Sequence, residues 1–127
     1  MSATRFTKDH EWVRQEGEIA VIGITDYAQS QLGDVVYVEL PEIGRQVEQG
    51  KEAAIVESAK AASEVYAPVS GEVVAVNDEI VSDPARVNAD AMGEGWFIKL
   101  RLADPKQLDA LMDQAGYDAF VAEQEQH

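Results

Sequence analysis

The sequence has no cysteine and only two histidines, one of which, His127, is the last residue. Without a thiol, the protein itself can form no disulfide, zinc–thiolate site or thiol nucleophile. A serine–histidine–carboxylate arrangement would have to use His10. The sequence also contains no nucleophile elbow, P-loop or dinucleotide-binding glycine motif. The sequence therefore lacks the side chains and motifs typical of an enzyme active site. This composition is compatible with a carrier, in which an attached group supplies the chemistry.

Basic residues are also scarce. Ten Lys and Arg residues stand against 24 Asp and Glu residues, and the formal net charge is −14. We therefore exclude nucleic acids and anionic membrane surfaces as partners, because both require cationic side chains. A negative field of this size is expected to speed encounter with basic patches on partner proteins.

Long hydrophobic runs are absent as well. No stretch could span a bilayer, and residues 1–6 lack the apolar segment of a signal peptide. We therefore expect a cytoplasmic bacterial protein, or a mitochondrial matrix protein without its presequence if the source is eukaryotic. The length of 127 residues and the hydrophobic content of 46% predict one folded domain over residues 1–127. We also expect the protein to be a monomer.

An internal repeat occupies the centre of the chain. Residues 38–52 and 65–79 share one pattern, in which Val38, Pro41, Gly44 and Val47 match Val65, Pro68, Gly71 and Val74. Proline followed by glycine three residues later is typical of turns, and each following valine begins or lies within a strand. The pattern predicts two copies of one β unit, about residues 34–58 and 62–82, related by a quasi-two-fold rotation.

Lys60 lies where the two units join. Apolar, β-favouring runs at residues 53–56 and 65–67 flank it, and Glu57 and Glu64 bracket it at near-equal distance. We expect a β-hairpin whose tip presents Lys60 to solvent. The alternative is a short helix over residues 57–64, because Ala, Glu and Lys all favour helices.

The rest of the chain predicts further short elements. Strands are expected at residues 11–15, 18–23, 34–40, 51–56, 64–67, 72–76 and 96–102. In the strand at 34–40, the apolar face consists of Val36, Val38 and Leu40. A short helix should begin after Thr25 and end at Gly33. The irregular, acidic residues 79–92 are expected to hold one helical turn.

The chain should end in helices, over residues 104–125. Asp104 is predicted to cap the first of them, with Pro105 in its first turn and Gln107 reaching back as in a capping box. Apolar faces are formed by Leu108, Leu111 and Met112 and by Tyr117, Phe120 and Val121. Trp12 and Trp96 are predicted to be core residues.

Residues 56–64, Val-Glu-Ser-Ala-Lys-Ala-Ala-Ser-Glu, resemble the lipoyl-lysine site of the glycine cleavage system H protein family, which reads Val-Glu-Ser-Val-Lys-Ala-x-Ser-Asp. Residues 10–12, 23–26, 33–36, 38–41 and 93–96 match further family motifs. The resemblance covers about residues 6–120. The chain departs from the family pattern at Ala59, at Glu64 and at Ala91-Met92, where the family usually has Val, Asp and Pro-Tyr.

The resemblance implies a mainly β fold, the lipoyl/biotinyl-type barrel-sandwich hybrid with its quasi-two-fold repeat. It implies a lipoate group joined covalently to Lys60 as N6-lipoyllysine, on an arm on the order of a dozen Å long. The protein would be a carrier, not an enzyme. It would take an aminomethyl group from a pyridoxal-phosphate glycine decarboxylase to a tetrahydrofolate-dependent aminomethyltransferase, and a dihydrolipoamide dehydrogenase would reoxidise it.

The resemblance also implies roles for residues near Lys60. Glu57, Ser58 and Glu64 would be recognised by the lipoate-attaching enzyme, a lipoate ligase or an octanoyltransferase. Asp9, Glu11 and Glu64 would line the cleft that holds the aminomethyl group, because the loaded amine is cationic and favours carboxylates. The alternative is that these three acids are ordinary surface carboxylates. We expect no metal site.

Three other functions remain open. A lipoyl or biotinyl domain of another multienzyme complex would usually carry Asp-Lys-Ala or Met-Lys-Met and would lack both the strand around His10-Glu11-Trp12 and the C-terminal helices. A lipoate relay protein of the same family would donate its lipoyl group to other enzymes. An unmodified homologue is disfavoured by the retention of Lys60 with both flanking acids.

Overall fold

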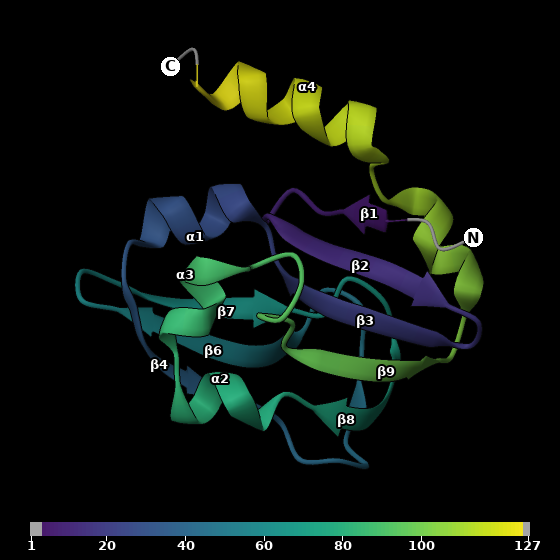
Figure 1. Cartoon of the computed structure of the whole chain (residues 1–127). Helices are drawn as coiled ribbons and strands as arrows, with labels where there is room; N and C mark the ends of the chain where they lie inside the picture. Colours follow the sequence, from purple (N-terminus) through teal and green to yellow (C-terminus); the bar gives the residue numbers. More distant parts are fainter. Residues whose placement is uncertain (1–3, 126–127) are drawn as a thin grey trace.

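Two antiparallel sheets organise the computed structural model, which describes residues 4–125 (Figure 1). Two parts of the sequence analysis lie outside the described residues. They are residues 1–3, which begin the segment considered for a signal peptide, and His127. The larger sheet has the order β1 (Thr4–Phe6), β2 (Glu11–Glu16), β3 (Ile19–Ile24), β9 (Ile98–Leu102), β8 (Gly71–Val76) and β5 (Gln46–Val47). The smaller sheet has the order β4 (Val35–Glu39), β6 (Glu52–Ser58) and β7 (Ala62–Tyr66). The mainly β fold is thus confirmed.

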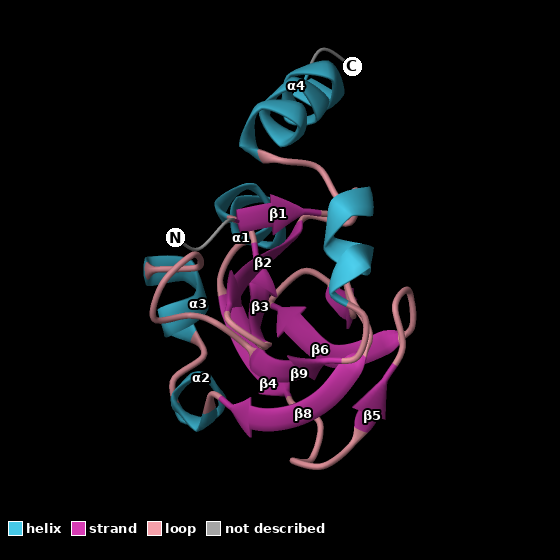
Figure 2. Cartoon of the chain, turned by 90° about the vertical axis from the view of Figure 1, so that its right-hand side faces the viewer, coloured by secondary structure: helices cyan, strands magenta, loops and turns pink. Residues whose placement is uncertain are grey.

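Helices lie around the sheets, and the last two elements of the chain are helical. They are α1 (Asp26–Leu32), α2 (Asp78–Ser82), α3 (Ala85–Ala89), the 3₁₀-helix η1 (Pro105–Ala110) and α4 (Gln114–Glu125). Thr25 caps α1 by accepting a hydrogen bond from the Ala28 N–H, and Gly33 ends it, as predicted. Figures 1 and 2 both show α4 on the side of β1, far from β8.

The alternation of side chains along the strands produces two apolar clusters. In β2 and β3, Val13 and Ile22 join the main core, whereas Trp12 and Val21 point to the opposite face of the sheet. There they pack with Phe6 and with Tyr117 of α4. The apolar face predicted for the last helix therefore covers the outer side of the larger sheet.

The segment around Lys60 forms a β-hairpin. Strands β6 and β7 pair from Glu52↔Tyr66 to Glu57↔Ala62, and residues 59–61 make the turn. The Ser58 side chain shapes this turn, because its Oγ accepts hydrogen bonds from the Lys60 N–H at 3.3 Å and the Ala61 N–H at 3.1 Å. The predicted hairpin is confirmed, and the helical alternative is wrong.

Strand β4 departs from the predicted alternation. Its pairing with β6 shifts register between Val35 and Tyr37, as in a β-bulge. Val35 and Val38 are consequently buried, whereas Val36 is 57% exposed. The prediction of Val36 in the apolar face was wrong, because a bulge changes the face to which the following residues point.

Several smaller predictions also need correction. The acidic segment after β8 contains two short helices, α2 and α3, rather than one turn. Asp104 does cap η1, but Gln107 does not reach back: its Oε1 accepts from the Ser70 N–H at 2.6 Å. Trp12 is fully buried, whereas Trp96 is only partly buried, with Lys99 Nζ 5.0 Å from its ring centre.

The repeat units differ at their ends. The first contributes β4, β5 and β6, and the second contributes β7, β8 and α2, so that Glu52 begins a strand whereas its counterpart Glu79 lies in a helix. The short strand β5 pairs with β8 through Gln46↔Glu72 and Val47↔Gly71. The two-fold superposition of the units stays a prediction.

Candidate functional site

Lys60 lies at the tip of the β6–β7 hairpin, which protrudes as a teal loop on the left of Figure 1. The side chain is exposed. The base of the turn is attached to the segment after α1, because the Ala59 N–H donates to the Asp34 carbonyl at 3.3 Å. Lys60 is thus an accessible amine on a fixed platform.

The stem of Lys60 passes over Gly33. A Cβ atom at Gly33 would lie only 3.2 Å from Lys60 Cε. Gly33 has φ 80° and ψ −157°, a conformation that is essentially restricted to glycine. The residue that ends α1 therefore also leaves room for the lysine stem.

A cavity of about 210 Å³ lies between the larger sheet, α1 and the hairpin strands. Its polar lining includes Asp9, Glu11 and Glu64, the three carboxylates predicted for a cleft, and its apolar lining includes Leu32 and Val65. Residues more than 50 positions apart in the sequence are thus brought to one cavity. We call this cavity the acidic cleft.

Glu11 is the buried member of the acidic cleft, with only 2% of its surface exposed. One carboxylate oxygen accepts from the Thr7 hydroxyl at 2.9 Å, and the other accepts from the Tyr66 N–H at 2.7 Å. Glu11 therefore links β2 to β7. Burial raises the pKa of Glu11 to about 7, although both hydrogen bonds lower it, and the charge of Asp9 raises it slightly further.

Glu64 and Asp9 lie at the exposed rim of the cleft. Glu64 Oε2 accepts a hydrogen bond from the Tyr66 hydroxyl at 2.9 Å, and this bond and the charge of Glu64 raise the pKa of Tyr66. The Asp9 N–H donates to the Thr7 hydroxyl at 3.2 Å. The rim carboxylates remain hydrated, unlike that of Glu11.

The predicted recognition residues divide between two positions. Glu57 and Glu64 line a broad hollow of about 560 Å³ on the outer side of the hairpin strands. Ser58 is buried and shapes the turn instead. Glu64 lines both the outer hollow and the acidic cleft, whereas Glu57 lines only the hollow.

His10 is a cleft residue that the sequence analysis did not assign. It adopts φ 66°, which is uncommon for a residue other than glycine. Its Nδ1 lies 2.8 Å from the Tyr117 hydroxyl, which lies 2.6 Å from the hydroxyl of Thr25, the residue that caps α1. This network connects the cleft to α4, and no sequence pattern indicated it.

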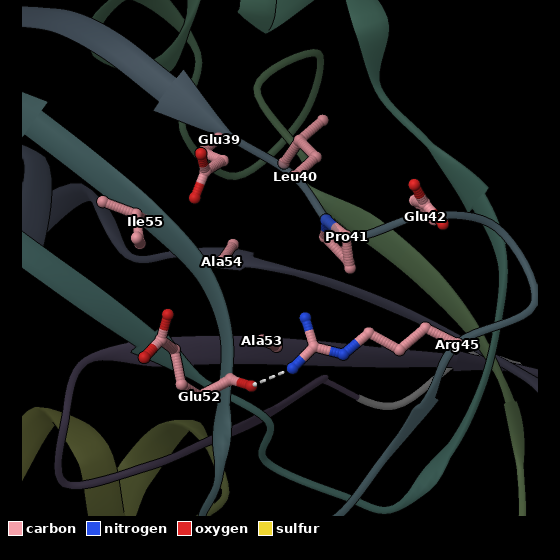
Figure 3. A pocket seen from close by; sticks show the side chains of 9 residues that line it. All are labelled: Glu39, Leu40, Pro41, Glu42, Arg45, Glu52, Ala53, Ala54 and Ile55. Atoms are coloured by element: carbon pink, nitrogen blue, oxygen red, sulfur yellow. Dashed lines mark hydrogen bonds between the residues drawn. The ribbon is translucent and has the colours of Figure 1, made fainter.

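Another cavity, of about 380 Å³, lies at the far end of β6 (Figure 3). It is lined by Glu39, Glu42 and Glu52 together with Arg45, whose guanidinium donates to the Glu52 carbonyl at 3.4 Å. No polar side chain that lines this cavity is buried, so the cavity lacks an enclosed carboxylate like that of Glu11 in the acidic cleft.

Within residues 4–125, no group of three or more His, Asp or Glu side chains is arranged to hold a metal ion. No helix in that range combines the length and the hydropathy needed to cross a membrane.

Comparison with known proteins places the chain in a family. The family model described as glycine cleavage H-protein matches residues 4–124. The chain belongs to this family. The glycine cleavage system H protein of Parvibaculum lavamentivorans is 69% identical over 121 residues, which cover 95% of this chain and 97% of that protein. The H protein of Rhodospirillum rubrum is 64% identical over 124 residues, covering 97% and 98%.

A solved structure shows the same fold. The crystal structure of a glycine cleavage system H protein from Mycobacterium marinum matches with a TM-score of 0.87 at 33% identity, and covers 94% of this chain and 97% of that one. The family resemblance carried by the motifs around Lys60 is confirmed over nearly the whole length.

Proposed function

We propose that this H-protein family member is a non-catalytic lipoyl carrier of glycine cleavage, modified on Lys60. The observation that carries the proposal is the position of Lys60: an exposed amine at a hairpin tip, beside a cleft lined by three carboxylates. The names of the relatives support it, since they are called glycine cleavage system H proteins.

The surroundings of Lys60 fit a lipoyl group. Acylation of Nζ gives a neutral amide and extends the side chain. Gly33 leaves the lysine stem room, and Leu32 and Val65 give the adjacent cleft an apolar wall suited to a hydrocarbon arm. When bound, lipoate supplies the dithiolane chemistry that a chain without cysteine lacks.

The acidic cleft would shelter the aminomethyl cargo. The cargo carries an amine that is cationic at neutral pH, and Glu11, Glu64 and Asp9 surround the space it would enter. A cation close to Glu11 favours the ionised carboxylate and would lower the pKa of Glu11, so that the carboxyl group loses its proton when the cargo enters. Enclosure also keeps water from the labile cargo.

The partners follow from this role. They are a pyridoxal-phosphate glycine decarboxylase, a tetrahydrofolate-dependent aminomethyltransferase, a dihydrolipoamide dehydrogenase and the enzyme that attaches lipoate, a lipoate ligase or an octanoyltransferase. The bacterial sources of the relatives support a cytoplasmic location. Strand β2 and the C-terminal helices η1 and α4, which lipoyl domains of other complexes lack, favour glycine cleavage over service in those complexes.

The proposal is tested by locating the modification. Intact mass of protein from lipoate-replete cells should show one lipoyl adduct, and peptide mapping should place it on Lys60. Lys60→Arg keeps the charge but cannot accept lipoate, so we expect complete loss of carrier activity with an unchanged circular dichroism spectrum. Lipoate on Lys51 or Lys99 instead of Lys60 would refute the assignment.

A further inference from the structure

The outer face of the smaller sheet carries several side chains, of which the proposed carrier cycle uses only Glu64. We define this outer face by Tyr37, Glu39, Ile55, Glu57, Glu64 and Tyr66. They form adjacent rows across the strands, since Tyr37 pairs with Glu57, and Ile55 lies between Glu39 and Glu64. Their neighbours Val38, Val56 and Val65 point the other way, into the core.

This outer face combines apolar surface with uncompensated negative charge. Tyr37 is 45% exposed, and Ile55 and Tyr66 border the hollow of about 560 Å³. The salt bridges found within residues 4–125 use Arg14, Arg86 and Arg101, and none of them involves a carboxylate of the outer face. Negative charge with an exposed tyrosine is suited to lysine and arginine side chains.

The raised pKa values of Tyr37 and Tyr66 reflect the negative charge of the outer face. The charge of Glu39, the largest influence, raises the pKa of Tyr37, and Glu57 adds to the effect. Glu64 raises the pKa of Tyr66 by its hydrogen bond and its charge, and Asp9 and Glu52 contribute. Arg45 is the one basic side chain among the described residues that line the two hollows over this sheet, and it lies at the end remote from Lys60.

We propose that the outer face is the docking surface for the enzyme that acylates Lys60, and that this enzyme presents lysine and arginine side chains to it. The proposal rests on the proposed function, because it requires Lys60 to be acylated. It goes beyond recognition of Glu57, Ser58 and Glu64, since it assigns binding to Tyr37, Glu39 and Ile55.

The distance from Nζ at which each enzyme can act distinguishes the acylating enzyme from the enzymes of the carrier cycle. The acylating enzyme must bring its reactive carbon to Nζ itself, whereas the others meet an arm on the order of a dozen Å long. A standard interface covers about 800 Å² on each partner, which is a disc of roughly 16 Å radius. Glu57 lies three residues and Ile55 five residues from Lys60, or roughly 10 and 17 Å along the extended strand. An interface that contains Lys60 and extends along the outer side of the hairpin therefore reaches the row of Glu39, Ile55 and Glu64.

The reaction at Lys60 is amide formation without redox change. The neutral Nζ attacks the acyl carbon of an activated donor, an acyl adenylate or an acyl thioester. The new N–C bond forms, the bond to the phosphate oxygen or thiol sulfur breaks, and that atom keeps the electron pair. Nζ releases one proton to solvent.

The test measures the initial rate of acylation of the unmodified full-length protein by a purified lipoate ligase, with lipoate and ATP, at protein concentrations below KM. Glu39→Lys should lower kcat/KM roughly tenfold, because a like charge opposes the basic enzyme. Glu39→Gln should give a smaller decrease in the same direction. Tyr37→Thr, which keeps β propensity, should also lower kcat/KM, with little dependence on salt.

Glu18→Lys is the matched control. It makes the same charge change at an exposed turn between β2 and β3, away from the hairpin, and should alter the rate less than about twofold. Thermal unfolding should show that the variants are folded. Equal rates for Glu39→Lys and Glu18→Lys would overturn the proposal, as would a loss confined to transfer from the decarboxylase. A parent protein that is not acylated on Lys60 would refute the proposed function instead.

Discussion

On the cleft side of β7, Glu11 is enclosed between the sheets, and both of its carboxylate oxygens accept hydrogen bonds from the protein. On the outer face, Glu39, Glu57 and Glu64 stand on the surface without a salt bridge to any described residue. The pKa of Glu11 is raised to about 7 by burial. The outer carboxylates instead act on their neighbours, by raising the pKa of Tyr37 and of Tyr66.

Under the proposed function, one kind of side chain serves two purposes, according to burial. A contact to a desolvated carboxylate is strong and short-ranged, and it suits a cargo that must be held. A hydrated carboxylate contributes less than about 1 kcal/mol to a single ion pair, but its field extends over a Debye length and suits the attraction of a partner. The hairpin presents Lys60 between these two environments.

The largest expected effect concerns the lifetime of the loaded protein. Glu11→Gln should still accept lipoate, but it removes the buried charge that we propose holds the cationic cargo. Such a contact contributes about 1.5–3 kcal/mol, so ammonia release without folate should become at least about tenfold faster once the decarboxylase is removed. Glu64→Gln, at the hydrated rim, should change the rate by no more than about fivefold.

Both variants should be reduced and reoxidised like the parent, which serves as the control for an intact arm. Equal acceleration in the two variants would remove the distinction between buried and rim carboxylates. Release as slow as that of the parent in both would show that these acids are ordinary surface groups and that the cargo is sheltered elsewhere.

The second expected effect is on stability. Glu11→Ala removes the acceptor of the Tyr66 N–H and of the Thr7 hydroxyl, and also removes a carboxyl group that is costly to bury. We expect the free energy of unfolding at pH 7 to fall by about 1–2 kcal/mol, measured by urea denaturation. Glu64→Ala should stay within about 0.5 kcal/mol of the parent. A Glu11→Ala protein as stable as Glu64→Ala would mean that the link between β2 and β7 is not stabilising.

The sequence predicted the hairpin, the Thr25 cap and the presence of Lys60 at the tip, because these depend on short-range turn and propensity signals. It did not predict the bulge that exposes Val36, since the shift arises from pairing with β6. Gln107 is also diverted by a distant partner, Ser70. Long-range contacts override local patterns in both cases.

The acidic cleft was predictable only in part. The family resemblance indicated Asp9, Glu11 and Glu64, but not that Glu11 would be buried while the other two lie at the rim. That distinction depends on how closely β7 approaches β2 in three dimensions. The contact of the His10 side chain with Tyr117 likewise depends on where α4 packs.

The third prediction uses pH to isolate Glu11. Its folded-state pKa of about 7 exceeds the ordinary glutamate value of 4.5, so between these values the folded state binds more protons, and rising pH lowers stability. The difference in unfolding free energy between the parent and Glu11→Gln should fall by about 1 kcal/mol from pH 6 to pH 7, and should level off above about pH 8. Because both proteins keep Asp9, Glu64 and His10, the comparison isolates the effect of residue 11. A difference that is flat across this range would refute the burial of an ionisable Glu11.

The smallest effect should come from salt, and it should separate the two environments in a single assay. With a net charge of −14, the protein should be attracted to a decarboxylase with a basic surface, and added salt screens that attraction. The apparent KM of the decarboxylase for the lipoylated protein should rise a few-fold between roughly 0.02 and 0.3 M salt, where the Debye length becomes shorter. The lifetime of the loaded protein should hardly change over the same range, because the contact with Glu11 lies inside the cleft. If the lifetime shortens with salt as the KM rises, the cargo is held by hydrated rim carboxylates, and Glu11 has a structural role only.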